Sequence, residues 1–163
     1  MRRYFKVVAL PVLLLAGCNL SKFPIDDPAV VKIDARLLGT WKEQEEKKKA
    51  ESELYTFAKL DDTHYTLIAK EQGKKKIEKY TAFLSEINNV PFLNVHYKDD
   101  STDGYFFIKI LAINATGDKF MASPVSDSTM QLLTSSAMVR ARIKGNVDQP
   151  AFYIDTLHFS KVK

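Results

Sequence analysis

From Gly39 to the C-terminus, short β-prone runs follow one another with turns of hairpin length between them. The runs are rich in aromatic and β-branched residues, and clusters of turn-forming residues at 61–63, 88–89 and 99–104 separate them. Strands joined by turns this short pair antiparallel with their sequence neighbours. The run 105–113 is apolar on both faces, which indicates a central, well-covered strand. We therefore predict a mostly β fold, an antiparallel meander with strands expected at 39–41, 54–60, 64–69, 77–87, 90–97, 105–113, 119–122 and 152–162.

The spacing of the apolar residues changes from strand-like to helix-like at only one place in this part of the chain. Met130, Leu133 and Ala137 recur at intervals of three and four residues, which gives a helix one apolar face. We predict a helix at about 127–137, just before the last strand. The stretch 138–144 is ambiguous between a continuation of this helix and a strand.

The first 17 residues have the layout of a secretory signal. Arg2, Arg3 and Lys6 give a positive head, an apolar run follows at 7–15, and two small residues close the segment. The run is too short to cross a hydrocarbon layer about 30 Å thick as a helix. A buried helix would show polar residues at regular spacing, and this run shows none. Residues 1–17 are therefore predicted to be a signal peptide.

The sequence Leu15-Ala16-Gly17-Cys18 resembles the lipobox of bacterial lipoproteins, and Cys18 is the only cysteine. The resemblance implies cleavage between Gly17 and Cys18, a diacylglycerol on the Cys18 thiol and an acyl chain on the new amino group, with no other cofactor. Such acylation provides a stable membrane anchor. It places the protein in the bacterial cell envelope. Asn19 is compatible with export to the outer membrane, which we favour over the inner membrane, with the domain in the periplasm or at the cell surface.

The expected mature chain divides into two parts. Residues 18–33 contain few apolar side chains and are predicted to be the lipidated N-terminus and a flexible tether, and 34–163 is predicted to be one barrel domain. The full chain has a formal net charge of +4, but the signal takes three of the 24 basic residues, which leaves 21 bases against 20 acids. This near-balance argues against nucleic-acid binding.

The sequence Gly39-Thr40-Trp41, at the start of a meander that has a helix before its closing strand, resembles the lipocalin-like (calycin) barrels. The resemblance implies about eight strands, with Trp41 closing the bottom of the barrel and an interior that can hold a small apolar ligand. Many lipocalins place an arginine late in the chain over this tryptophan, but the closing strand here has none. No cysteine pair is present either.

Side chains alternate between the two faces of a strand. If Trp41 points inward, Glu43 and Glu45 do so too, and buried carboxylates need partners. Either the strand ends or bulges after Trp41, which is the preferred expectation, or the mouth of the barrel is acidic.

Two functions remain open at this point. In the first, the membrane-anchored barrel binds a small apolar or amphiphilic ligand. The candidate lining residues are Trp41, Tyr55, Phe57, Tyr105 and Phe107, although strand parity leaves the faces of the last four open. In the second, the barrel is filled by its own side chains and its surface binds an envelope protein.

No catalytic set is found in the sequence. His64, His96 and His158 are isolated from one another, and no metal-binding, phosphate-binding or nucleophile motif occurs. Paired acids such as Asp61 and Asp62 fall in turns, where aspartate is favoured for backbone hydrogen bonding. We therefore expect no enzyme activity and no metal site.

Overall fold

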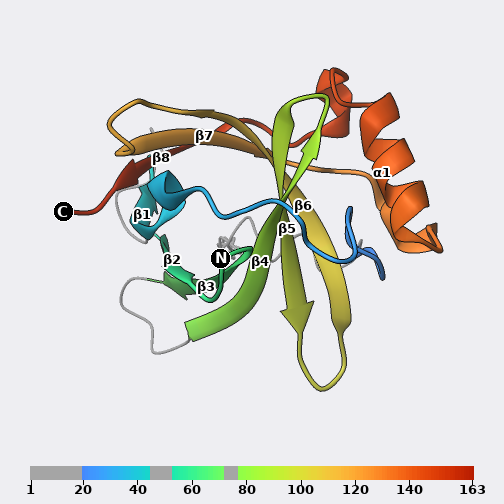
Figure 1. Ribbon diagram of the computed structural model, residues 1–163, viewed down its shortest axis with the longest axis horizontal. Helices are drawn as coiled ribbons and strands as arrows, with labels where there is room; N and C mark the ends of the chain where they lie inside the picture. The colour runs from blue at the N-terminus through green and yellow to red at the C-terminus, as the bar shows by residue number, and fades with distance from the viewer. Residues whose placement is uncertain (1–19, 45–52, 72–76) are drawn as a thin grey trace, which may run out of the picture.

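The computed structural model describes residues 20–44, 53–71 and 77–163, and these residues contain a closed barrel of eight strands. Each strand pairs antiparallel with its sequence neighbours, and β8 closes the barrel against β1. This confirms the predicted antiparallel meander barrel (Figure 1). The strands are β1 (Gly39–Glu43), β2 (Glu53–Lys59), β3 (His64–Glu71), β4 (Ile77–Ile87), β5 (Val90–Lys98), β6 (Asp103–Ile113), β7 (Lys119–Pro124) and β8 (Leu157–Lys161).

One helix precedes the last strand, as predicted, but its bounds differ from the expected 127–137. A short 3-10 helix, η3 (Ser128–Leu132), ends at Leu133, whose backbone is extended. The chain then restarts as α1 (Ser136–Gly145), because the Ser135 hydroxyl accepts a hydrogen bond from the Met138 amide at 3.3 Å and caps the new helix. The ambiguous stretch 138–144 is therefore helical. Another 3-10 helix, η4 (Pro150–Phe152), precedes β8.

The apolar side chains form two cores, one on each side of the sheet. The interior core fills the barrel, whereas the outer core lies between α1 and the outer face of the sheet, at the right of Figure 1. Strand β6 serves both cores, since Phe106 belongs to the interior core and Phe107 to the outer core. The prediction that the run 105–113 is covered on both faces is confirmed for 105–110, but Leu111 is 41% exposed. The outer core contains Ile25, Ile87, Phe92, Phe107, Met130, Val139, Ile143, Val147 and Phe152.

Residues 20–33 cross the outside of the barrel, and we call this segment the strap. In Figure 1 it is the blue chain that runs in front of the sheet towards β1. The expectation that this segment packs little on the domain is wrong for the described residues. Ile25 is only 1% exposed and belongs to the outer core, and Phe23 packs against the same core. Val30, in contrast, is 70% exposed.

Polar contacts attach the strap along its length. The Ile25 amide donates to the buried Asn94 side-chain oxygen at 2.8 Å, and Asp26 forms a salt bridge with Arg140 at 2.9 Å. At the far end, the Ile33 amide donates to the Asp62 carbonyl at 3.0 Å. These contacts join the strap to β5, to α1 and to the turn between β2 and β3.

The first strap contact uses an unpaired edge of β6. Strand β7 pairs with β6 only from Ile108 onward, so the backbone of Tyr105 is open on that side. Ser21 occupies this position, with its amide 2.9 Å from the Tyr105 carbonyl and its carbonyl 2.7 Å from the Tyr105 amide. Gly104 allows this close approach. A Cβ atom there would lie 2.8 Å from Leu20 Cβ and 2.9 Å from the Ser21 carbonyl oxygen.

Replacing Gly104 by alanine is therefore expected to lower the free energy of unfolding by about 1–3 kcal/mol, as overpacking does. The clash is partly with backbone, which cannot move aside without breaking the Ser21 pairing. Thermal and urea unfolding of the purified protein measure the loss.

The matched control is Gly145→Ala, at the end of α1, where a Cβ would meet nothing within 4 Å. Alanine is favoured over glycine in helices, so this variant should be neutral or slightly more stable. Equal losses in the two variants would contradict the close approach at Gly104.

Candidate functional site

The floor of the barrel is built from Trp41 and the 3-10 helix η2 (Ala35–Leu37). Asp34 caps η2, and the buried Trp41 indole donates from Nε1 to the Leu37 carbonyl at 2.7 Å. This bond ties the strand to the short helix before it and fixes the ring across the base of the interior. Trp41 is thus buried in the interior core beside η2.

Lys161 lies over the Trp41 ring, with its Nζ 4.8 Å from the ring centroid. Gly39 leaves room for it: its φ is +121°, and a Cβ there would lie 3.2 Å from Lys161 Cε. The closing strand therefore supplies a cation over the tryptophan ring. Lys161 was not identified from the sequence. The feature that could have indicated it is its place on the closing strand, where it is the strand partner of Trp41.

Aromatic rings in contact fill the interior above the floor. Trp41 meets Phe120 edge-on at 4.7 Å between centroids, Phe120 stacks on Phe159 at 4.5 Å, and Phe159 meets Tyr55 at 5.8 Å. Phe57 belongs to the same interior core. These edge-on and stacked arrangements are the favourable geometries for aromatic pairs. The rings form a continuous set of contacts from Trp41 to Tyr55, which is also the strand partner of Trp41.

The opposite end of the interior, which we call the mouth, combines tyrosines with carboxylates. The Tyr55 hydroxyl donates to Glu53 at 2.5 Å, and the Tyr80 hydroxyl donates to Glu78 at 2.5 Å. Glu53 faces Glu71 directly across the β2–β3 pair. Burial raises the pKa of the Glu53 carboxyl above its usual range, because desolvation disfavours the charged form, and the carboxylates of Glu78 and Glu71 add to the rise.

The strand β1 continues past Trp41 to Glu43, which pairs with Phe159 of β8. The strand therefore ends after Trp41, as in the preferred expectation, but only at Glu43, and this carboxylate stays on the strand and adds to an acidic mouth. The physical reason is that Tyr55 and Tyr80 hydroxyls reach this end and hydrogen-bond carboxylates there. Glu45 lies outside the described residues.

The structure separates the candidate lining residues into two groups. Trp41, Tyr55 and Phe57 lie in the interior core. Phe107 lies in the outer core, and Tyr105 packs against that core and stacks on His96 at 4.4 Å between ring centroids. These two residues do not line the interior, because the inward positions of β6 before its bulge are those of even number, such as Phe106 and Ile110. Gly17 and Cys18 lie outside the described residues.

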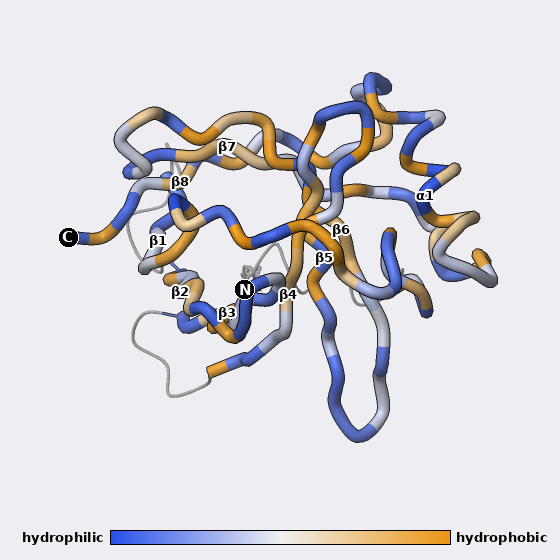
Figure 2. The backbone as a smooth tube through the Cα atoms, viewed as in Figure 1, coloured by the Kyte–Doolittle hydropathy of each residue, from blue (hydrophilic) through white to orange (hydrophobic). Residues whose placement is uncertain are grey.

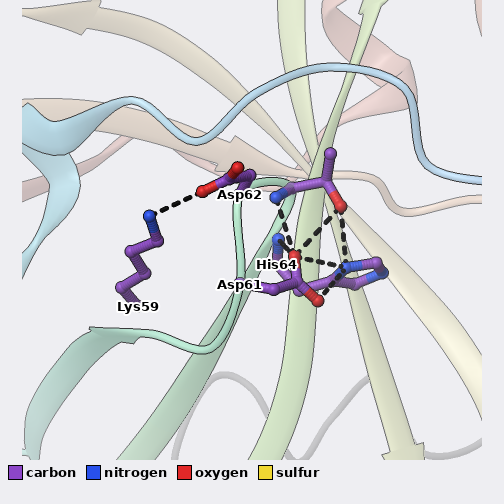
Figure 3. A network of polar contacts seen from close by, with 5 residues as sticks. Lys59, Asp61, Asp62 and His64 are labelled. Atoms are coloured by element: carbon purple, nitrogen blue, oxygen red, sulfur yellow. Dashed lines mark hydrogen bonds and ion pairs between the residues drawn. The ribbon is translucent and has the colours of Figure 1, made fainter.

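Figure 3 shows the turn between β2 and β3, where Lys59, Asp61, Asp62 and His64 gather. The Asp61 carboxylate accepts hydrogen bonds from the Thr63 amide at 2.7 Å and the His64 amide at 2.8 Å, and Lys59 pairs with Asp62 at 2.7 Å. The backbone hydrogen bond from Thr63 is the largest cause that lowers the pKa of Asp61 to about 2. This cluster is a structural turn that receives the end of the strap through the Asp62 carbonyl.

The other two histidines, His96 and His158, lie in different surroundings. His96 contacts Asp103 at 2.7 Å, whereas His158 is exposed on β8. Within the three described ranges, no group of three histidine, cysteine, aspartate or glutamate side chains is placed to hold a metal ion.

The fold and site together define a small closed antiparallel barrel with a tryptophan floor, an acidic mouth and a helix packed on the outside. No family model, no curated protein and no solved structure matches the chain. In the part of the chain that the structure describes, no helix has both the length and the apolar character needed to span a bilayer.

Proposed function

We propose that this chain is a lipid-anchored protein of the bacterial cell envelope, cleaved between Gly17 and Cys18 and held in the membrane by acyl chains on Cys18. The order of charged head, apolar run and small residues before the only cysteine supports the anchor. Asn19 is compatible with export to the outer membrane, which is the membrane that we propose. A lipocalin-like origin of the barrel is supported by Gly39-Thr40-Trp41 together with the Lys161 cation over the Trp41 ring.

We further propose that the barrel is a side-chain-filled scaffold, without enzyme activity, whose exterior binds an envelope protein. The observation that carries this proposal is the path of contacting rings from Trp41 through Phe120 and Phe159 to Tyr55. An acyl chain that enters along this path must displace rings that are already buried and in favourable contact. Interiors packed this closely resist the insertion of extra groups.

A small apolar or amphiphilic ligand is the second candidate. The observation that favours it is the mouth, where the partly buried Tyr97 ring lies 5.7 Å from Tyr80 above an apolar interior. Burying eight CH₂ groups gains roughly 6 kcal/mol. Trp41, Tyr55 and Phe57 are then the lining residues. The free energy gained on binding must also offset the cost of displacing the aromatic rings.

Tryptophan fluorescence separates the two candidates, because Trp41 is the only tryptophan. We expect the mature chain with Cys18→Ala to show blue-shifted emission, since Trp41 is fully buried. Titration with fatty acids or lysophospholipids is expected to leave this emission unchanged, and native mass spectrometry is expected to give the mass of the chain alone.

The matched control for this titration is Phe120→Ala, which removes the ring that lies edge-on to Trp41. Apolar cavities made in this way stay dry and bind small apolar molecules. The variant should therefore respond to such a probe. If a fatty acid or lysophospholipid changes the Trp41 emission of the chain without this substitution, the ligand-binding candidate is favoured. A small molecule that co-purifies with the chain would favour it too. Red-shifted emission would instead place Trp41 in water and refute the barrel floor.

A further inference from the structure

The strap fixes the chain almost immediately after the proposed anchor. Ser21 is fully buried and is paired through two backbone hydrogen bonds with Tyr105. Leu20 precedes it and packs against the interior core. Only Asn19 lies between Leu20 and Cys18. Two residues span at most about 7 Å of extended chain. The acyl chains of Cys18 are therefore attached close to Leu20, whatever path the intervening residue takes.

Leu20 lies at a defined end of the barrel. It contacts the position of Gly104 near the start of β6, and Gly104 is the strand partner of Tyr97 near the end of β5. Because neighbouring strands run antiparallel, β1 ends, β2 begins, β3 ends, β4 begins, β5 ends and β6 begins at this same end. It is the end that carries the mouth residues Glu53 and Tyr55. The helix η2, whose Leu37 carbonyl accepts the hydrogen bond from Trp41, precedes the start of β1 at the other end.

We propose that the mouth end of the barrel rests on the lipid headgroups and that the floor end points away from the membrane. This inference rests on the lipid anchor proposed above. A flexible tether would let the domain tumble, but a strap that is bound from Ser21 onward leaves too short a free segment for this. The surface partner at the mouth end is the lipid layer itself.

On the outer face of the sheet near the mouth end, exposed apolar and basic side chains suit this partner, whereas the carboxylates of the mouth itself do not attract anionic headgroups. Ile77, at the start of β4, is 59% exposed and is the strand partner of the exposed Lys70. Lys79, two residues further on the same face of β4, is also exposed. An exposed isoleucine between two lysines can insert apolar surface while the ammonium groups meet anionic headgroups. The partly exposed Tyr97 has an apolar ring and a polar tip, which is typical of side chains at a membrane interface.

The test uses single cysteines at the two ends of β6 in the full-length, lipidated protein. Asp100 lies in the exposed turn between β5 and β6, at the mouth end, and Figure 2 shows this hairpin ending in hydrophilic residues. Ala115 lies in the exposed turn between β6 and β7, at the floor end. The two turns are separated by the length of β6, about 35 Å at 3.3 Å per residue. Acylation blocks Cys18, so the introduced thiol is the only one available for labelling.

Each variant, Asp100→Cys and Ala115→Cys, is labelled with a fluorophore and reconstituted in vesicles of phosphatidylethanolamine and phosphatidylglycerol that carry a headgroup-attached quencher. We expect several-fold stronger quenching at Asp100 than at Ala115. Inserting about twelve glycine and serine residues between Asn19 and Leu20 adds a linker of roughly 20 Å and should remove most of the difference. The insertion leaves the strap contacts intact, so thermal unfolding should not change.

The outcomes separate this inference from the proposed anchor. Mass spectrometry of the same preparation shows whether Cys18 carries acyl chains. If it does, and the two labels are quenched equally or Ala115 more strongly, the orientation is wrong and the anchor stands. If Cys18 carries no acyl chains, the anchor and the orientation are both wrong. Vesicles of phosphatidylcholine alone should preserve the order of quenching, since the short attachment and not charge alone sets the orientation.

Discussion

Replacing Cys18 by alanine is expected to move the protein from the membrane fraction to the soluble fraction. The thiol is the only group in the chain to which the lipobox resemblance assigns a diacylglycerol, and a single amide-linked chain would hold a protein only marginally. The variant should also keep its signal, because the lipoprotein peptidase acts on the acylated cysteine. Fractionation, gel migration and intact mass measure these effects.

Lys22→Ala is the matched control for the anchor variant, since Lys22 is exposed and lies outside the Leu15–Cys18 motif. It should be cleaved, acylated and membrane-bound like the unaltered chain. A Cys18→Ala protein that stays in the membrane and migrates like the unaltered chain would refute the lipobox interpretation.

Deleting the strap, residues 20–33, is expected to remove most of the stability of the barrel. The deletion takes Ile25 out of the outer core, and truncating a buried residue of this size alone costs about 2–5 kcal/mol. It also removes a partner of the buried Asn94 amide and of the Tyr105 backbone, at about 1–3 kcal/mol for each buried group left unsatisfied. The sum is a large share of the roughly 5–15 kcal/mol that stabilises a domain. Thermal and urea unfolding of the mature chain measure it.

Two substitutions within the strap provide a sharper comparison than the deletion. Ile25→Ala removes a side chain that is 1% exposed, and Val30→Ala removes one that is 70% exposed. We expect a loss of about 2–5 kcal/mol for the first and less than about 0.5 kcal/mol for the second. Similar small losses in both would restore the original interpretation of residues 19–33 as a loose tether.

The strand pattern could be predicted from the sequence because each strand is bounded by local turn chemistry. The bounds of β4, Ile77–Ile87, agree with the predicted run, and β3 and β5 differ only by one or two residues at one end. The last strand was predicted at 152–162 but begins at Leu157. There, Pro150 starts a 3-10 turn and Phe152 turns into the outer core, so tertiary packing overrides the β propensity of the segment.

The side of the sheet that a residue faces could be predicted only where one face is polar. At Tyr105 and Phe107 both faces of β6 are apolar, so the alternation gives no signal, and the outward position of Phe107 depends on α1 and the strap covering that face. The strap itself gave no signal of packing. Its composition is that of a linker, and its attachment depends on single contacts such as Ile25 with Asn94. Such contacts between distant parts of the chain leave no periodic pattern in the sequence.

The attachment of the strap also has a consequence for the order in which parts of the chain fold. The strap residues are made first, but their partners are made much later, since Ile25 binds Asn94, 69 residues on, and Asp26 binds Arg140, 114 residues on. The strap therefore cannot dock until most of the barrel is present, so the first part of the described chain is among the last to pack.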